Sequence, residues 1–173
     1  MREHIAVART ALLDRDDDRG QPVTPSTATR RHVLGWGSLV ARLGGAVAVL
    51  VIGAIHLEAY HGPYSAVATI GVLFLLNVFA AAVIGVTLLA PVERLLGRRS
   101  SVAVVLVTTA GIGLAVVSLL MLIVAERGTL FGFHEPGYDP GAIWRSRVAE
   151  IVAACLLTTS LALRALAPSR PRW

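Results

Sequence analysis

The chain has 173 residues, of which 55% are hydrophobic and only 16% are charged. A soluble domain normally carries about 25% charged residues, so this composition argues against a water-soluble globular protein. The net charge of +5 comes from 16 basic residues, all of them arginine. Because these arginines flank apolar segments and no recognition motif accompanies them, we expect no nucleic-acid partner.

The N-terminal segment differs in composition from the rest of the chain. Residues 1–37 contain a cluster of aspartate and arginine, followed by Pro22, Pro25 and several serine and threonine residues. A segment of this composition cannot bury a hydrophobic core. We therefore expect residues 1–37 to form a disordered cytoplasmic tail.

Four apolar segments follow, at about 39–60, 65–90, 101–125 and 146–166. Each is near or above the roughly 20 residues that cross a hydrocarbon core of ~30 Å as a helix. The segments are too long and too uniformly apolar for β-barrel strands, which alternate between two faces. The sequence predicts an all-α integral membrane protein, a four-helix up-and-down bundle over residues 38–167, with a short cytoplasmic tail over 168–173.

The arginines indicate how the chain is oriented. Thirteen lie in the N-terminal segment, in the loop after the second span or at the C-terminus, and three lie on the opposite side: Arg127, Arg145 and Arg147. Basic loops stay in the cytoplasm, so both termini are predicted to be cytoplasmic. Anionic lipid headgroups on that face are the expected counter-charge for the arginines.

Small residues four positions apart occur in every span. In lipid no hydrophobic force brings helices together, and such pairs let two backbones approach closely. They predict a close-packed bundle and equally suit self-association or a protein partner. The pairs are Ala41/Gly45, Gly44/Ala48, Ala81/Gly85, Thr109/Gly113, Gly111/Ala115 and Ala149/Ala153.

A few polar side chains lie inside the spans, and Glu150 is the costliest of them. A carboxylate at the centre of a transmembrane helix costs about 2.5–3.5 kcal/mol on insertion scales, so Glu150 should face the bundle interior or have a partner. His56 is the candidate partner, since both residues lie about four positions from the outer ends of their spans. Tyr60 shares a helical face with His56, and Asn77 lies near the middle of the second span.

Two interpretations of these four residues stay open. In the first, His56, Tyr60, Asn77 and Glu150 line an outward-facing pocket that binds a ligand or passes a proton. In the second, Asn77, Ser118 in the outer half of the third span, and the His56–Glu150 pair form interhelical hydrogen bonds that hold the bundle together.

A second polar group is predicted outside the membrane, in the first and last outer loops. It comprises His61, His134, Glu135 and Asp139. Histidine and carboxylate side chains are ligands for zinc and other divalent ions. Their spacing matches no established metal signature, so solvated loop residues are the alternative interpretation.

Several chemistries lack their sequence signatures. The single cysteine, Cys155, excludes an intramolecular thiol–disulfide pair, and no second histidine lies at the depth of His56 to hold a haem. Gly-rich phosphate loops and the metalloprotease and hydrolase signatures are absent from the sequence. We therefore predict no cofactor and favour a non-enzymatic protein.

Some segments carry a resemblance to a known group of proteins. They are Gly53 to Leu57 with Tyr60, Ile70 to Asn77, and Leu130 to Glu135 with Glu150 downstream. Together they resemble small four-span membrane proteins of actinobacteria, over roughly residues 45–160. The resemblance implies a bacterial plasma-membrane setting and treats these residues as one feature, but it implies no activity.

Two functions are consistent with these observations. The first is a non-enzymatic accessory or structural membrane component, which would dock through its lipid-facing surface and its arginine-rich tail. The second is a small transporter or proton-coupled ligand-binding protein that uses the pocket around His56 and Glu150.

Overall fold

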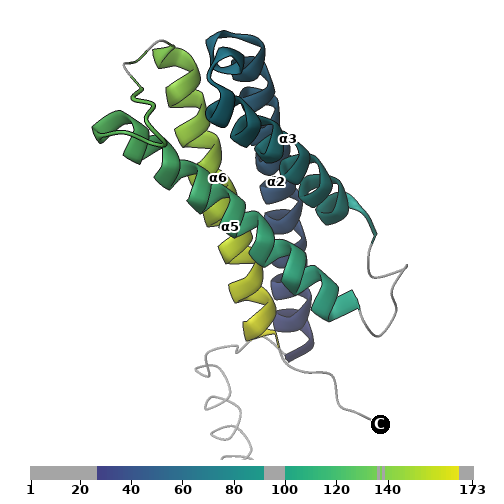
Figure 1. Cartoon of the computed structure of the whole chain (residues 1–173). Helices are drawn as coiled ribbons and strands as arrows, with labels where there is room; N and C mark the ends of the chain where they lie inside the picture. The colour runs from purple at the N-terminus through teal and green to yellow at the C-terminus, as the bar shows by residue number, and fades with distance from the viewer. Residues whose placement is uncertain (1–26, 92–99, 136, 138, 168–173) are drawn as a thin grey trace, which may run out of the picture. The chain divides into compact units, whose positions relative to one another are not determined.

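The computed structural model describes residues 27–91, 100–135, 137 and 139–167. In this part of the chain four long helices follow one another in alternating directions (Figure 1). They are α2 (Thr27–His61), α3 (Ala68–Leu89), α5 (Ser100–Arg127) and α6 (Pro140–Leu166). Each is long and apolar enough to cross a membrane. The predicted all-α bundle of four spans is confirmed, and the chain is a multi-pass membrane protein.

The first helix begins earlier than the sequence indicated. Residues 27–37 were assigned to the tail, but they form the first turns of α2. Pro25 is the last proline before the span, and the alanine, arginine and leucine residues that follow favour helix, so the helix extends backward from its apolar part. The expectation of a disordered segment is therefore wrong for residues 27–37. Residues 1–26, 92–99, 136, 138 and 168–173 lie outside the described residues. They include the rest of the predicted N-terminal tail and all of the predicted C-terminal tail.

The other boundaries differ by a few residues. Residues Pro63–Ala66 form a short 3-10 helix, η2, so the second span begins at Ala68 and not at 65. The fourth helix begins at Pro140, where the side chain of Asp139 accepts a hydrogen bond of 2.9 Å from the amide of Ala142. Proline at the first helical position and aspartate at the N-cap both favour this start. Helix α6 therefore begins more than one turn before residue 146, where the fourth span was predicted to begin.

Small residues bring the four helices together. Each helix contributes one completely buried alanine to a common core: Ala46, Ala81, Ala115 and Ala153. At Gly53 of α2, an added Cβ atom would lie 2.9 Å from the Cβ atom of Ala81 in α3. At Gly45, it would lie 2.5 Å from the Leu157 side chain of α6. These glycines are therefore required for the observed approach of α2 to its two neighbours.

One of the predicted small-residue pairs does not belong to the core. Thr109 and Gly113 are exposed on the outside of α5, and nothing lies within 4 Å of a Cβ atom added at Gly113. The pair Gly111 and Ala115 faces the interior instead, because positions two apart on a helix point in very different directions. The members of Ala41/Gly45, Ala81/Gly85 and Ala149/Ala153 are buried as predicted.

Two serines join the first and last helices. The Ser38 hydroxyl donates to the carbonyl oxygen of Ser160 at 3.1 Å, and the Ser160 hydroxyl donates to the carbonyl oxygen of Ser38 at 2.9 Å. Both side chains are buried. This reciprocal pair satisfies two hydroxyl groups where water is absent, and it fastens α2 to α6 near the end opposite to η2.

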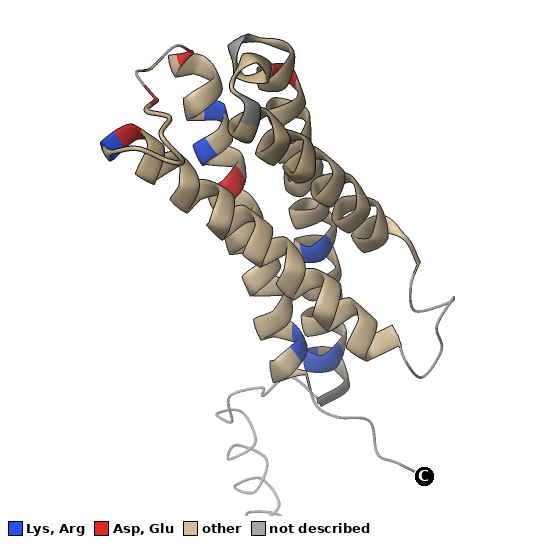
Figure 2. Ribbon diagram, in the orientation of Figure 1, with Lys and Arg blue, Asp and Glu red and all other residues tan. Residues whose placement is uncertain are grey.

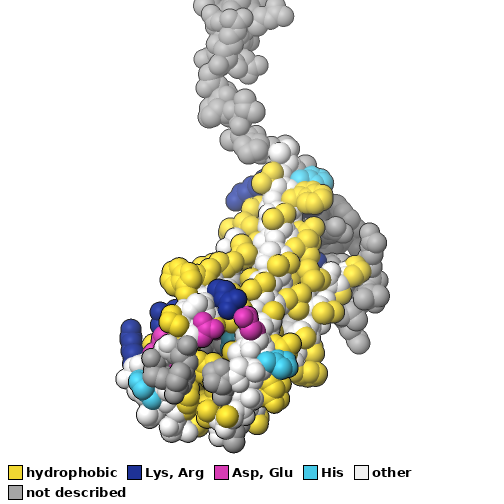
Figure 3. All heavy atoms as spheres, turned by 90° about the horizontal axis from the view of Figure 1, so that it is seen from above, with side chains coloured by type: hydrophobic (Ala, Val, Ile, Leu, Met, Phe, Trp, Pro, Cys, Tyr) yellow, Lys and Arg dark blue, Asp and Glu magenta, His cyan; other side chains and the backbone are white. Residues whose placement is uncertain are grey.

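The two ends of the bundle differ in charge. We call the end at which α2 and α5 finish, and at which η2, α3 and α6 begin, the η2 end. Among the described residues every acidic side chain lies toward this end, whereas arginines lie toward both (Figure 2). Viewed from above in Figure 3, charged side chains gather on the η2 end between hydrophobic flanks. The apolar flanks are the surface that lipid chains would cover.

We expect Gly53→Val to destabilise the bundle, because the added methyl groups would collide with Ala81, whose short side chain cannot move aside. Overpacking of this kind costs about 1–3 kcal/mol. Gly113→Val is the matched control, since open space surrounds that position. The measurement is thermal unfolding of both variants in detergent. Equal unfolding temperatures for the two variants would contradict the packing described for α2 and α3.

Candidate functional site

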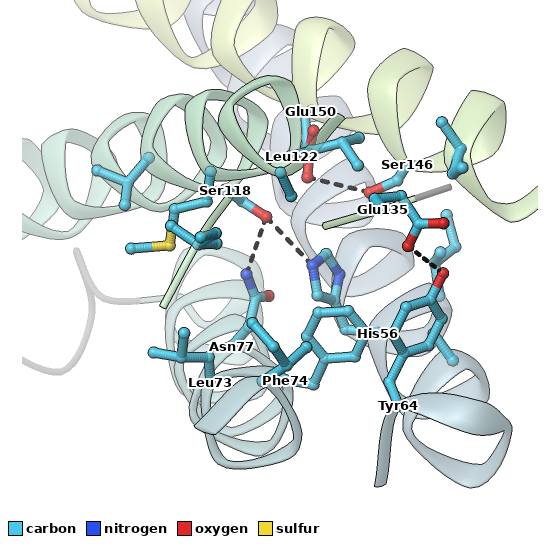
Figure 4. Close-up of a pocket in the computed structure, with 18 of the residues that line it drawn as sticks. His56, Tyr64, Leu73, Phe74, Asn77, Ser118, Leu122, Glu135, Ser146 and Glu150 are labelled. Atoms are coloured by element: carbon cyan, nitrogen blue, oxygen red, sulfur yellow. Dashed lines mark hydrogen bonds between the residues drawn. The ribbon is translucent and has the colours of Figure 1, made fainter. Parts of the chain in front are cut away.

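A cavity of about 320 Å³ lies inside the bundle at the η2 end. All four helices, η2 and the loop between α5 and α6 contribute to its wall. Most of the lining is apolar, with side chains such as Ile55, Leu73, Phe74, Met121 and Leu122. The polar lining residues are few and come from every element: His56, Tyr64, Asn77, Ser118, Glu135, Ser146 and Glu150 (Figure 4).

Ser118 of α5 is the hub of a hydrogen-bond network across three helices. Its hydroxyl oxygen accepts a bond of 3.1 Å from the Asn77 amide of α3 and lies 3.2 Å from Nε2 of His56 in α2. The other ring nitrogen of His56, Nδ1, lies 2.9 Å from the carbonyl oxygen of Ile52. A carbonyl only accepts, so Nδ1 carries a proton, and in the neutral ring Nε2 accepts from the Ser118 hydroxyl.

Glu150 of α6 lies on the same cavity and is only 1% exposed. Its Oε1 atom accepts a bond of 3.0 Å from the Ser146 hydroxyl, one turn earlier on the same helix. Its Oε2 atom is buried and has no hydrogen-bond partner among the described residues. Ser118 also lies near this carboxyl group, but its one hydroxyl proton is engaged by His56.

Asn77, like Glu150, has a buried oxygen atom without a hydrogen-bond partner among the described residues. Its amide nitrogen is bonded to Ser118, whereas its Oδ1 atom is buried without a partner among the described residues. A buried acceptor that lacks a donor costs about 1–3 kcal/mol. Such atoms are rare in native proteins and call for an explanation. Both atoms belong to residues that line the same cavity.

The predicted pocket residues are partly brought together. His56, Asn77 and Glu150 line one cavity, although the three residues lie on three different helices. The direct pairing of His56 with Glu150 is wrong, because neither a hydrogen bond nor an ion pair joins these two described side chains. His56 bonds to Ile52 and Ser118, and Glu150 bonds to Ser146. A cavity, as in the first interpretation, and interhelical hydrogen bonds, as in the second, are therefore both present in this part of the bundle.

Tyr60 does not line the cavity, and the sequence interpretation is wrong on this residue. The positions of α2 that face the cavity are Ile55, His56 and Ala59, so Tyr60 lies about 100° further round the helix from Ala59. Its ring contacts His61 instead. Tyr64 lies at the cavity where Tyr60 was expected, because η2 turns the chain back toward the cavity. No local sequence pattern indicated the direction of that turn.

Tyr64 and Glu135 connect the two outer loops at the cavity. The Tyr64 hydroxyl donates to Oε2 of Glu135 at 2.6 Å, a length typical of a hydrogen bond to a charged oxygen. Oε1 of Glu135 accepts from the amide of Gly137 at 2.9 Å. Both residues are only 6% exposed. Glu135 was expected in the outer loop, but its buried position and its tyrosine partner come from the tertiary structure.

The loop between α5 and α6 folds back toward the bundle through a tight turn. Leu130 and Phe133 exchange two backbone hydrogen bonds, of 2.7 and 2.9 Å. The two residues between them, Phe131 and Gly132, have φ angles of 51° and 81°. A two-residue turn of this kind requires positive φ at both positions, which glycine adopts without strain. The turn places Phe133 against Tyr64, with ring centroids 6.0 Å apart.

The four candidate metal ligands are not brought together. No three histidine, cysteine or acidic side chains of the described residues gather in an arrangement that could hold a metal ion. His61 bonds to the carbonyl oxygen of Leu57, and His134 bonds to that of Gly128. Asp139 caps α6, and Glu135 binds Tyr64. His61, His134 and Asp139 each bond to a group of their own helix or loop, whereas Glu135 bonds across to η2.

Two arginines of the η2 end, Arg145 and Arg147, pair with carboxylates outside the cavity. Arg147 forms an ion pair with Glu126 of α5, and Arg145 lies 3.3 Å from Glu58 of α2. None of these four side chains lines the cavity. Among the described residues, the cavity wall therefore contains two carboxyl groups and no arginine.

Comparisons with protein families, with curated proteins and with solved structures found no match to this chain.

Loss of the hub should weaken the bundle. Ser118→Ala removes hydrogen bonds to two helices, and interhelical bonds in membranes contribute about 0.6 kcal/mol each on average. We therefore expect a loss of about 1 kcal/mol in the free energy of unfolding, measured in mixed micelles. Thr87→Val is the control, since the exposed Thr87 hydroxyl bonds only to Val83 of its own helix. A Ser118→Ala variant as stable as the control would contradict the role of Ser118 in joining the three helices.

The contact between Tyr64 and Glu135 should hold the outer loop in place. Removing a hydrogen bond to a charged group costs about 1.5–3 kcal/mol. In Tyr64→Phe we therefore expect the amides of Glu135 and Gly137 to exchange with deuterium about tenfold faster or more. Tyr60→Phe is the matched control, because Tyr60 makes no hydrogen bond to this loop. Unchanged exchange in Tyr64→Phe would show that other contacts hold the loop.

Proposed function

We propose that this chain is a bacterial inner-membrane protein that binds a small, mostly apolar molecule in the cavity at the η2 end. The observation that carries the proposal is the combination of apolar walls with two buried oxygen atoms that lack hydrogen-bond donors, on Asn77 and Glu150. A molecule that presents a donor to either atom would remove a desolvation cost that the protein itself leaves uncompensated.

The size and lining of the cavity support this proposal. Small-molecule sites usually enclose about 300–1,000 Å³, have mostly hydrophobic walls and carry a few converging polar groups. The cavity of about 320 Å³ has these properties at the lower end of that range. Ionisable residues inside a membrane are expensive and are functional by default, which applies to Glu150.

The orientation of the chain follows from its arginines. We propose that the η2 end faces away from the cytoplasm, because only Arg127, Arg145 and Arg147 lie on that side of the sequence. The arginines of the other side would then contact anionic headgroups of the inner leaflet. The bacterial setting rests on the resemblance to four-span actinobacterial proteins. The cavity would thus open toward the outer side of the membrane.

Ligand binding is favoured over acyl-transfer catalysis at this site. The contact between Ser118 and His56 has the atom types of a nucleophile and its base. However, Ser118 lies within α5, where the neighbouring backbone amides are engaged in helical hydrogen bonds and cannot form an oxyanion hole. The amide of Asn77, the nearest side-chain donor, already bonds to the serine oxygen. The network therefore positions polar groups at the wall of a binding cavity.

Ligand binding is also favoured over a purely structural role as an accessory component. Docking through the N-terminal tail would involve residues 1–26, which lie outside the described residues. A bundle that served only as a scaffold would gain stability by filling the cavity and pairing Asn77 Oδ1 and Glu150 Oε2, because both costs oppose folding. The open cavity is therefore the feature that a scaffold does not require.

The proposal predicts saturable binding of a compact apolar molecule with one donor group. We name radiolabelled 1-adamantanol as the probe, and measure its binding to the full chain in lipid nanodiscs by scintillation proximity. Ala80→Phe should abolish the saturable component, because Ala80 lines the cavity and the larger ring would fill it. Val83→Phe, on the exposed face of the same helix, should bind as the wild type does.

Two results would overturn the proposal. One is the absence of any saturable binding to the wild-type chain. The other is equal binding by a monodisperse Ala80→Phe variant, which would place the probe outside the cavity.

A further inference from the structure

The charges around the cavity narrow the class of ligand, and this inference rests on the proposed function. We propose that the cavity selects a lipophilic amine or another apolar organic cation, whose charged group binds the Glu150 carboxylate. The argument combines the charges of the cavity wall, the unpartnered oxygen of Glu150 and the aromatic rings on the opposite wall.

The lining has an excess of negative groups. Glu135 and Glu150 both line the cavity, whereas Arg145 and Arg147 of the same end pair with Glu58 and Glu126 outside it. Arg147 lies three residues before Glu150 on α6, but its guanidinium group is bound to Glu126 and does not line the cavity. Arg147 acts on Glu150 only as a nearby charge, whereas a cationic ligand would place a positive charge in the cavity, next to the buried carboxylate.

The two carboxyl groups have different roles. Both oxygen atoms of Glu135 are occupied, by the Tyr64 hydroxyl and the Gly137 amide. Glu150 accepts a bond from Ser146 through Oε1, Ser118 lies near the same carboxyl group, and Oε2 of Glu150 is buried without a hydrogen-bond partner among the described residues. The oxygen atom left for a ligand is therefore Oε2 of Glu150, which is fully buried, so the side chain must turn toward the cavity for a ligand to reach it. An ammonium group donates charge-assisted hydrogen bonds, which are roughly twice as strong as neutral ones.

Aromatic rings form the wall that faces Glu150. Figure 4 shows Phe74 and Tyr64 on the opposite side of the cavity from Glu150 in that view. Their ring centroids are 5.0 Å apart, and Phe74 also meets the ring of His56 edge to face at 5.1 Å. The faces of aromatic rings attract cations, most strongly in a desolvated site. The hydrocarbon part of the ligand would contact Leu73 and Leu122.

Of the other polar groups, His56 offers no further acceptor, whereas Asn77 does. In the neutral tautomer of His56 described above, the Nε2 lone pair is occupied by the Ser118 hydroxyl. The Asn77 Oδ1 atom is a second free acceptor on the same cavity.

The test compares two probes of nearly the same shape, 1-adamantylamine, which is cationic at neutral pH, and 1-adamantanol, which is neutral. Their dissociation constants for the full chain in neutral-lipid nanodiscs are measured by scintillation proximity. We expect the amine to bind at least about tenfold more tightly than the alcohol, as expected for a charge-assisted contact. Glu150→Gln should remove this preference and leave the affinity for the alcohol nearly unchanged.

Glu58→Gln is the matched control, because it removes the same charge from the same end of the bundle at an exposed position outside the cavity. It should keep the preference for the amine. Equal affinities of the two probes for the wild type, or a preference that survives in a folded Glu150→Gln variant, would overturn the inference. Both of those results leave the proposed function intact, whereas binding of neither probe would overturn the proposed function itself.

Discussion

The close approach of α2 to α3 and α6 is the constraint on which the rest of the structure depends. A lipid bilayer supplies no hydrophobic force between helices, so they associate through contact of their backbones and small side chains. Gly53 meets Ala81, and Gly45 meets Leu157, at distances that leave no room for a Cβ atom. These contacts lie along the middle of the helices. Toward the η2 end the side chains no longer fill the interior, and the cavity occupies the space.

The polar residues follow from the same constraint. Hydroxyl, amide and carboxyl groups within a span must find partners inside the protein, because lipid offers none. Ser38 and Ser160 pair completely with each other, in the tightly packed half. Asn77, Ser118, His56 and Glu150 instead lie around the cavity, where the network leaves two acceptor atoms without donors. The reciprocal serine pair is a structural contact, whereas the two acceptor atoms beside the cavity mark the candidate binding site.

The candidate site was partly visible in the sequence. His56, Asn77 and Glu150 could be singled out because polar groups in apolar spans are rare, and a helical rise of ~1.5 Å per residue places His56 and Glu150 at similar depth. Ser118 could also be named as a candidate for a bond between helices, although serine often bonds to its own helix. Its role as a hub depends on which side of α5 meets α2 and α3. Tyr64 was missed in favour of Tyr60, because the direction of the chain after a helix end is not encoded by helical periodicity.

The sequence by itself determined the number and approximate limits of the spans, because the distribution of apolar and charged residues over about 20 positions follows directly from the thickness of the hydrocarbon core. It also identified most of the small residues at which helices touch. Only the tertiary structure decided that Glu150 bonds to Ser146 and not to His56, that Ser118 lies between three helices, and that the outer loop closes onto Tyr64. These contacts depend on the rotation of each helix about its axis and on the path of the loops. Both are set by packing among all four helices together, which the pattern of any one segment does not contain.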